Sequence, residues 1–287
     1  MHRRRINKKF LAVLGIVFAL RPVFSAGQSS GDPFSALDKA FYEVEYTPTP
    51  EDEYYIGRAV SANILSVYEP YTEKPALTNY VNLICQALVI NSSRPPVYNG
   101  YHVTILNSTE FNAFATPGGH IFITRGLVEA VASEDELAGI IAHELSHVML
   151  KHGMKMIDDM KIDEEINAMA RQAAGFSGNS GQRIVVFRDS VSGLFYAMAK
   201  NGYSVPQEFE ADIAAVDLLA AAGYTPTSFI DLLRLFQRNE PLWDEGFGTT
   251  HPNPAQRIAN VERKAKSYRV ADTRSHRKAR FERTVKN

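Results

Sequence analysis

The chain has 287 residues, of which 45% are hydrophobic and 22% are charged, and its formal net charge is −1. These proportions are ordinary for a globular protein and exclude collagen-like, disordered and multi-span membrane proteins. A single cysteine, Cys85, excludes an internal disulfide and a multi-cysteine zinc site. The near-neutral charge gives no reason to expect nucleic acid as a partner.

Residues 1–26 are predicted to be a secretory signal peptide. Five basic residues lie within residues 1–9, an unbroken apolar run covers residues 10–20, and small residues follow at Ser25 and Ala26. This order is typical of a signal peptide, and the apolar run is short against the about 20 residues of a membrane-spanning helix. We therefore expect export, with an uncleaved signal that anchors the chain in the membrane as the alternative.

The near-neutral net charge is a cancellation between segments of opposite sign. Residues 27–262 contain 15 basic and 30 acidic residues, whereas residues 263–287 contain ten basic and two acidic residues. The basic C-terminal tail, assigned to residues 266–287, is either a solvated helix or an electrostatic contact with an anionic membrane surface or an acidic partner.

The remaining elements predict one mostly helical α+β domain with a small three-stranded sheet. A polar lead-in segment over residues 27–50 precedes two stretches of helical spacing, 51–71 and 75–90. Three short strands follow at 101–106, 111–115 and 121–124, with a strong turn signal at 116–119 between the last two. From residue 126 the pattern is mostly helical and is interrupted by a Gly/Ser-rich break at 175–181. The helices that we expect there cover 133–151, 158–174, a stretch from Ser204, another from Thr225 to about Gln237, and a last one from Asn253.

The helix that begins at Ser133 carries the sequence His143-Glu144-Leu145-Ser146-His147. Two histidines four residues apart lie on one face of a helix, close enough to bind one metal ion. Zinc suits this nitrogen pair and needs one further protein ligand and a position for water. Glu144, which lies beside the pair, could take a proton from that water. The alternative is a pair of unrelated core or surface histidines.

A third ligand is expected from the helix that begins at Ser204. Glu208 and Asp212 are four residues apart and so share one face. One carboxylate could bind the metal while the other accepts a hydrogen bond from a ligand histidine. Spacing alone equally allows these acids to complement the positive end of the helix dipole.

Together these motifs resemble those of the gluzincin metallopeptidases, the family that includes HtpX, the CAAX prenyl proteases and a soluble, periplasmic BepA-like branch. The shared segments are, in order, 112–119, His143–His147, 208–212 and His251-Pro252, and the likeness spans about residues 51–265. The resemblance implies a zincin-like metallopeptidase domain over 51–265, with an active-site helix that carries HExxH. The chain departs from BepA in lacking its C-terminal helical repeats, and the Gly-rich stretch at 175–181 is an addition without an assigned role.

The resemblance also implies residue roles. His143, His147 and Glu208 match the ligands of one Zn²⁺ per chain, Glu144 matches the general base, and Asp212 matches the carboxylate one turn after the third ligand. Phe114 and Ala115 match the edge strand on which an extended substrate binds. His251 matches a histidine near the metal, which would either donate to the oxyanion or bind the resting zinc and block the water position. It could instead be a histidine that merely precedes the last helix.

The function predicted from this resemblance is that of a periplasmic zinc endopeptidase acting on unfolded or misassembled envelope proteins. The alternative is a zinc-bearing quality-control scaffold that binds such clients with little turnover. Nucleic acid is not expected as a partner of an exported chain.

The sequence also predicts the positions of three further side chains. His152, five residues after His147, is expected to face away from the metal-binding pair. His120 is expected at a turn surface, with a position that lines the cleft as the alternative. Cys85 is expected to be a buried small residue within the helix 75–90.

Overall fold

The computed structural model describes residues 48–159, 202–239 and 251–287, all within one compact unit, Pro48–Asn287. The predicted signal peptide (1–26), most of the lead-in segment (27–50), nearly all of the predicted helix 158–174 and the break at 175–181 lie outside these residues. None of the helices within the described ranges combines the length and the apolar character needed to cross a membrane.

A small mixed sheet organises the first half of the domain, and the prediction of three strands is confirmed. The strands are β1 (His102–Leu106), β2 (Ala113–Thr116) and β3 (His120–Thr124), in the order β1-β3-β2. The central strand β3 is parallel to β1 and antiparallel to β2, so β2 is an edge strand of this sheet.

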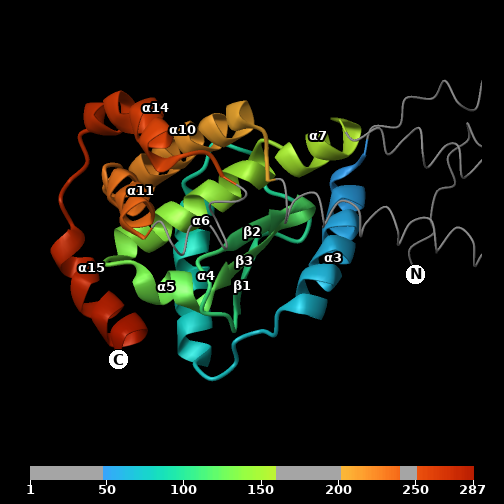
Figure 1. The fold of residues 1–287 in the computed structure, drawn as a ribbon, viewed down its shortest axis with the longest axis horizontal. Helices are drawn as coiled ribbons and strands as arrows, with labels where there is room; N and C mark the ends of the chain where they lie inside the picture. The colour runs from blue at the N-terminus through green and yellow to red at the C-terminus, as the bar shows by residue number, and fades with distance from the viewer. Residues whose placement is uncertain (1–47, 160–201, 240–250) are drawn as a thin grey trace, which may run out of the picture. The chain divides into compact units, whose positions relative to one another are not determined.

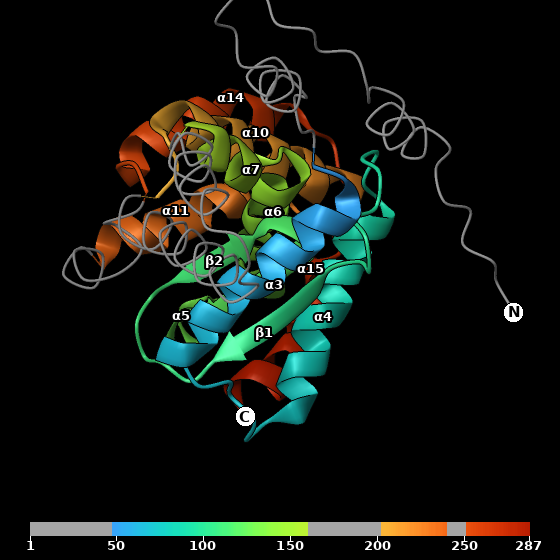
Figure 2. The same ribbon diagram turned by 90° about the vertical axis from the view of Figure 1, so that its right-hand side faces the viewer.

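Helices cover both faces of the sheet (Figures 1 and 2). Helix α3 (Pro50–Val67) packs on one face, where its Ile64 contacts Phe114 and Phe122. Helices α4 (Pro75–Ile90) and α6 (Glu134–Met149) pack on the other face, against Ile121 and Ile123. The strands are buried on both faces because their alternate side chains supply two separate apolar clusters.

The turn between β2 and β3 lies directly against α3. This turn is η1 (Pro117–Gly119), in which Gly118 has a φ of 74°. A Cβ atom on Gly57 of α3 would lie 1.7 Å from the Pro117 carbonyl oxygen, so only glycine permits this approach.

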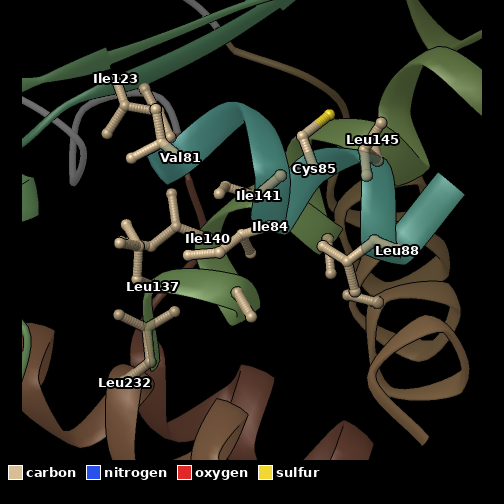
Figure 3. Close-up of a cluster of buried hydrophobic side chains, with 14 of the residues drawn as sticks. Val81, Ile84, Cys85, Leu88, Ile123, Leu137, Ile140, Ile141, Leu145 and Leu232 are labelled. Carbon is tan, nitrogen blue, oxygen red and sulfur yellow. The ribbon is translucent and has the colours of Figure 1, made fainter. Parts of the chain in front are cut away.

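Helix α6 is buried along almost its whole length and forms the centre of the core. Its Leu137, Ile140, Ile141 and Leu145 pack with Val81, Ile84, Cys85 and Leu88 of α4 and with Leu232 of α11 (Ser228–Arg238) (Figure 3). The Ser133 side chain accepts a hydrogen bond from the Glu136 N–H, as expected for an N-cap. Helices α7 (His152–Asp159), α10 (Val205–Ala221) and α11 also contact α6, and α14 (Pro254–Ser267) packs on α10 and α11. The short helix α5 (Arg125–Ala130) follows β3.

The predicted starts of α10 and α14 are confirmed in detail. Ser204 and Gln207 form a capping box at the start of α10, and Asn253 caps α14 by accepting from the Ala255 N–H. After α10, Gly223 has a φ of 77°, the left-handed conformation that commonly ends a helix.

The basic segment near the C-terminus packs as part of the domain. It forms α15 (Arg274–Phe281) and the π-helical turn η2 (Glu282–Lys286), and it places Phe281 and Val285 in the main core. Arg277 donates two hydrogen bonds of 2.8 Å to the buried Asp135 carboxylate, and Arg280 pairs with Glu134. The tail therefore neutralises the acidic N-terminus of α6, which lies beside α15 in Figure 1.

Candidate metal centre

Four side chains from three parts of the chain converge on one point. His143 and His147 come from α6, Glu208 from the first turn of α10, and His251 from the segment before α14. One potential ligand atom of each lies within 4.8 Å of those of the others. The Nε2 atoms of His143 and His147 are 3.1 Å apart, and that of His147 is 3.3 Å from Glu208 Oε1. The structure thus brings together His143 and His147 of the HExxH motif and Glu208 of the second motif, as the sequence predicts.

The chemistry of this group fits a metal cation. Glu208 is completely buried, and neither of its carboxylate oxygens has a hydrogen-bond partner among the described residues. A buried carboxylate without a partner is costly unless a cation neutralises it. Burial lowers the pKa of His147 to about 4 and that of His251 to about 3, so both imidazoles are neutral at physiological pH. Neutral imidazole is the form that binds metal.

Glu144 lies on α6 between the two histidine ligands in sequence and is 2% exposed. Its Oε1 atom is buried and has no hydrogen-bond partner within the described residues. Burial raises the pKa of Glu144 to about 7, as the nearby His143 and Arg257 offset only part of the desolvation. A carboxyl group with such a pKa can both accept and release a proton near neutral pH.

Asp212 lies where its spacing from Glu208 placed it, and it contacts a residue that the sequence analysis missed. Asp212 Oδ1 is 3.0 Å from His143 Nδ1, so this carboxylate can hold the proton of that ring nitrogen. Arg257, from α14, donates to both Asp212 oxygens at 2.6 and 3.0 Å and is only 1% exposed. Arg257 and Asp212 are 45 positions apart in the sequence, so no local spacing rule predicts their contact.

The prediction that His152 faces away from the metal-binding pair is wrong. Its Nδ1 atom is 2.9 Å from the Nδ1 atom of His147, and its side chain is completely buried. The prediction assumed one helix up to residue 151, but α6 ends at Met149. Lys151 then adopts a φ of 57°, which turns the chain so that α7 begins at His152. Helical spacing therefore does not apply between His147 and His152.

Within the described residues no further strand pairs with β2, and this edge of the sheet lies next to the candidate metal ligand His147. The Thr124 N–H donates to the Asn112 carbonyl at 3.0 Å, and hydrogen-bonded pairs alternate along an antiparallel ladder. The backbone groups of Ala113 and Ala115 therefore face away from β3, whereas those of Phe114 face toward it. Phe114 also directs its side chain to the α3 side, where its ring lies 5.9 Å from that of Tyr68. Of the two predicted substrate-contacting residues, only Ala115 presents its backbone at the edge.

Two side chains hold this edge in the present structure. Asn112 Oδ1 accepts from the Ala113 N–H at 2.9 Å, and the Tyr203 hydroxyl donates to the Ala115 carbonyl at 3.3 Å. The Tyr203 ring also stacks on His147, with centroids 4.1 Å apart and an interplanar angle of 15°. Tyr203 thus bridges the edge strand and a candidate metal ligand.

Comparison with known proteins places these motifs in a family. The sequence model described as peptidase family M48 matches residues 75–265. The chain is similar to the beta-barrel assembly-enhancing protease of Escherichia coli (strain K12), with 27% identity over 214 residues that cover 70% of this chain and 41% of that protein. It is also similar to metalloprotease LoiP of the same strain, with 28% identity over 198 residues, or 66% of this chain and 72% of that protein.

The chain spans about two fifths of the length of the first of these relatives. The family match covers more than half of the chain, and it includes the HExxH helix, Glu208 and His251. The mostly helical fold with its three-stranded sheet agrees with this match. The chain therefore belongs to peptidase family M48.

Proposed function

We propose that this chain is an exported zinc-dependent endopeptidase that hydrolyses peptide bonds in unfolded or misassembled envelope proteins. The observation that carries the proposal is the convergence of two imidazoles and a buried carboxylate on one point, with Glu144 beside them. The names of the M48 relatives support a proteolytic activity, and one of those names refers to β-barrel assembly.

We assign one zinc ion per chain to His143, His147 and Glu208, since two imidazoles and one carboxylate are a known catalytic donor set for zinc. Bound there, zinc would act as a Lewis acid and lower the pKa of water toward ~7. Asp212 holds the Nδ1 proton of His143 and so keeps its Nε2 atom available for the metal.

Glu144 acts as the general base in this proposal. Its carboxylate accepts the proton of the attacking water and returns it to the departing amine. His251, whose Nε2 atom lies 3.7 Å from Glu208 Oε2, either donates a hydrogen bond to the developing oxyanion or serves as a fourth ligand in the resting state.

The substrate would bind as an extended strand along β2. Its backbone would pair with the outward groups of Ala113 and Ala115, replacing Asn112 and the Tyr203 hydroxyl. Pairing of this kind reads the backbone more than the side chains, which suits unfolded proteins as substrates.

We further propose that residues 1–26 direct the chain to the periplasm, with membrane anchoring by an uncleaved signal as the alternative. Residues 51–265 carry the peptidase motifs in this proposal, and α15 and η2 complete the core of the same domain. The contact of the tail, 266–287, with a membrane surface or an acidic partner would then rest on bases other than Arg277 and Arg280, which pair with α6.

The test combines zinc content with digestion of unfolded casein. Wild-type protein is expected to bind one zinc ion and to cleave casein until a chelator is added. Glu144→Gln is expected to retain zinc and to lose cleavage, because the amide cannot accept the proton. Glu208→Ala is expected to lose zinc. Turnover by purified Glu144→Gln would refute the role of Glu144, and full zinc occupancy in Glu208→Ala would remove Glu208 from the ligand set.

The second candidate function is that of a zinc-bearing scaffold that binds envelope clients with little turnover. The contact of Tyr203 with the substrate edge and the position of His251 beside Glu208 both favour a closed resting state. His251→Ala separates the two roles of this histidine. A gain of casein cleavage supports inhibition by a fourth ligand, whereas a loss supports the oxyanion role.

A further inference from the structure

His152 is a buried histidine outside the group of candidate metal ligands. Its Nδ1 atom faces His147 Nδ1 at 2.9 Å, and its Nε2 atom lies 3.4 Å from Glu210 Oε2 on α10. The two rings are steeply inclined, with centroids 5.0 Å apart and an interplanar angle of 70°. The three side chains thus form a row, Glu210–His152–His147, that ends at the metal centre.

Metal binding at His147 would determine the positions of the hydrogens in this row. His147 directs Nε2 toward Glu208 and His143, where the candidate ligands converge. A metal bound there would use the lone pair of Nε2, so the hydrogen of the neutral ring would lie on Nδ1. Two Nδ1 atoms at 2.9 Å can share only one hydrogen, so His147 donates and His152 accepts. The hydrogen of His152 must then lie on Nε2, where the Glu210 carboxylate can accept it.

The plane of the His147 ring is fixed from a second direction. Tyr203 stacks against it nearly in parallel, at 15°. With His152 at Nδ1 and Tyr203 on the ring face, the remaining nitrogen of His147 is aimed at the point where the ligands converge.

The other ligand histidine is oriented by different groups. His143 Nδ1 lies 3.0 Å from Asp212, a carboxylate that Arg257 also contacts. Ligand histidines usually donate their second N–H to a carboxylate, a backbone carbonyl or water. At His147, the group that accepts the second N–H is the neutral imidazole of His152. The Glu210 carboxylate contacts the other ring nitrogen of His152 and does not contact His147 itself.

We propose that His152 is a positioning residue of the metal centre, which holds the Nδ1 hydrogen of His147 and thereby directs His147 Nε2 to the metal, with Glu210 fixing the tautomer of His152. This inference rests on the metal site of the proposed function, and it concerns metal affinity rather than peptide hydrolysis.

The test measures the dissociation constant of zinc for the full-length protein by competition with a chromophoric chelator. His152→Ala is expected to weaken zinc binding by about 10- to 100-fold, the usual effect of removing such a partner. His152→Asn is expected to recover most of this loss, because its Oδ1 atom can accept the hydrogen of His147 Nδ1. His120→Ala serves as the matched control, since His120 is a partly buried histidine on β3 in ring contact with Tyr54 and His102. The zinc affinity of His120→Ala should equal that of the wild type.

A spectroscopic measurement on the wild type does not depend on the folding of any variant. Imidazole ¹⁵N–¹H spectra of the zinc-loaded protein should show a hydrogen on Nδ1 of His147 and on Nε2 of His152, with ¹⁵N coupling between the two Nδ1 atoms across the shared hydrogen. A His147 without a hydrogen on Nδ1 would overturn the proposal. So would wild-type zinc affinity in His152→Ala, or equal losses in His152→Ala and His152→Asn.

The outcomes also separate this inference from the proposed function. If His152→Ala weakens zinc binding but the wild-type protein never cleaves casein, the proposed peptidase activity is refuted and the role of His152 stands. A peptidase whose zinc affinity is unchanged by His152→Ala would refute only the role of His152.

Discussion

At the residue scale, the side chains of the site depend on one another more than their positions in the sequence suggest. Arg257 is the clearest case, because it is 1% exposed and forms a bidentate ion pair with the completely buried Asp212. Burial raises the pKa of Asp212, but Arg257 and His143 more than offset this and hold the pKa below its usual range. Asp212 therefore stays ionised only while its partners are in place.

We predict that Arg257→Ala lowers the free energy of unfolding by about 3 kcal/mol, since removal of one partner leaves a buried charge uncompensated. Urea denaturation of the metal-free protein measures this change. Arg234→Ala, which removes an exposed pair with Asp231, is the control and should cost less than about 1 kcal/mol. Equal effects of the two substitutions would contradict the structural role of Arg257.

Cys85 gives a second prediction at this scale. It is completely buried between α4 and α6 (Figure 3), and burial raises the pKa of its thiol to about 12. The thiolate is the reactive form, so the folded protein should not react with Ellman's reagent at pH 8. In guanidinium chloride the single thiol should react fully, and rapid reaction in native buffer would show that this part of the core opens.

At the scale of elements, α6 is the helix on which the fold and the site both depend. Its C-terminal half carries both candidate histidine ligands, and its N-terminus bears the buried acids Glu134 and Asp135. Helix α15 neutralises these acids through Arg280 and Arg277. The basic tail thus stabilises the helix that carries the candidate metal ligands.

We predict that Arg277→Ala lowers the free energy of unfolding by about 3 kcal/mol, since Asp135 then remains buried without its partner. Lys278→Ala, on the next position of α15 with a side chain 73% exposed, is the matched control. Thermal unfolding followed by circular dichroism compares the two. A destabilisation by Lys278→Ala as large as that by Arg277→Ala would indicate that the ion pair with Asp135 does not account for the loss.

Local patterns predicted the elements and part of the site, and contacts between distant elements account for the rest. The spacing of His143 and His147, and of Glu208 and Asp212, is a property of one helix and can be read from the sequence. His152 was misplaced because a positive φ at Lys151 breaks the helix on which the spacing argument relied. The positions of Arg257 and of α15 arise from tertiary packing, which leaves no local pattern.

At the scale of the whole molecule, the candidate metal site joins α6, α10 and the segment before α14. A cation bound there would link parts of the chain that only the folded state brings together. Metal binding should therefore stabilise the whole domain, since the unfolded chain offers no such site.

We predict that zinc at about 1,000 times its dissociation constant raises the free energy of unfolding by about 4 kcal/mol. Denaturation with and without a chelator measures this difference. Glu208→Ala should abolish most of the increase, and magnesium should not reproduce it because it prefers oxygen ligands. An increase that survives in Glu208→Ala would indicate that zinc binds elsewhere.

The pairing of α15 with α6 also affects the time at which a newly made chain can complete its fold. Arg277 and its partner Asp135 are 142 positions apart, and ribosomes add about 5–20 residues per second. On the order of ten seconds therefore pass between the synthesis of the two residues. During this interval α6 lacks the guanidinium groups that neutralise its buried acids, so the domain should reach its full stability only after α15 has been synthesised.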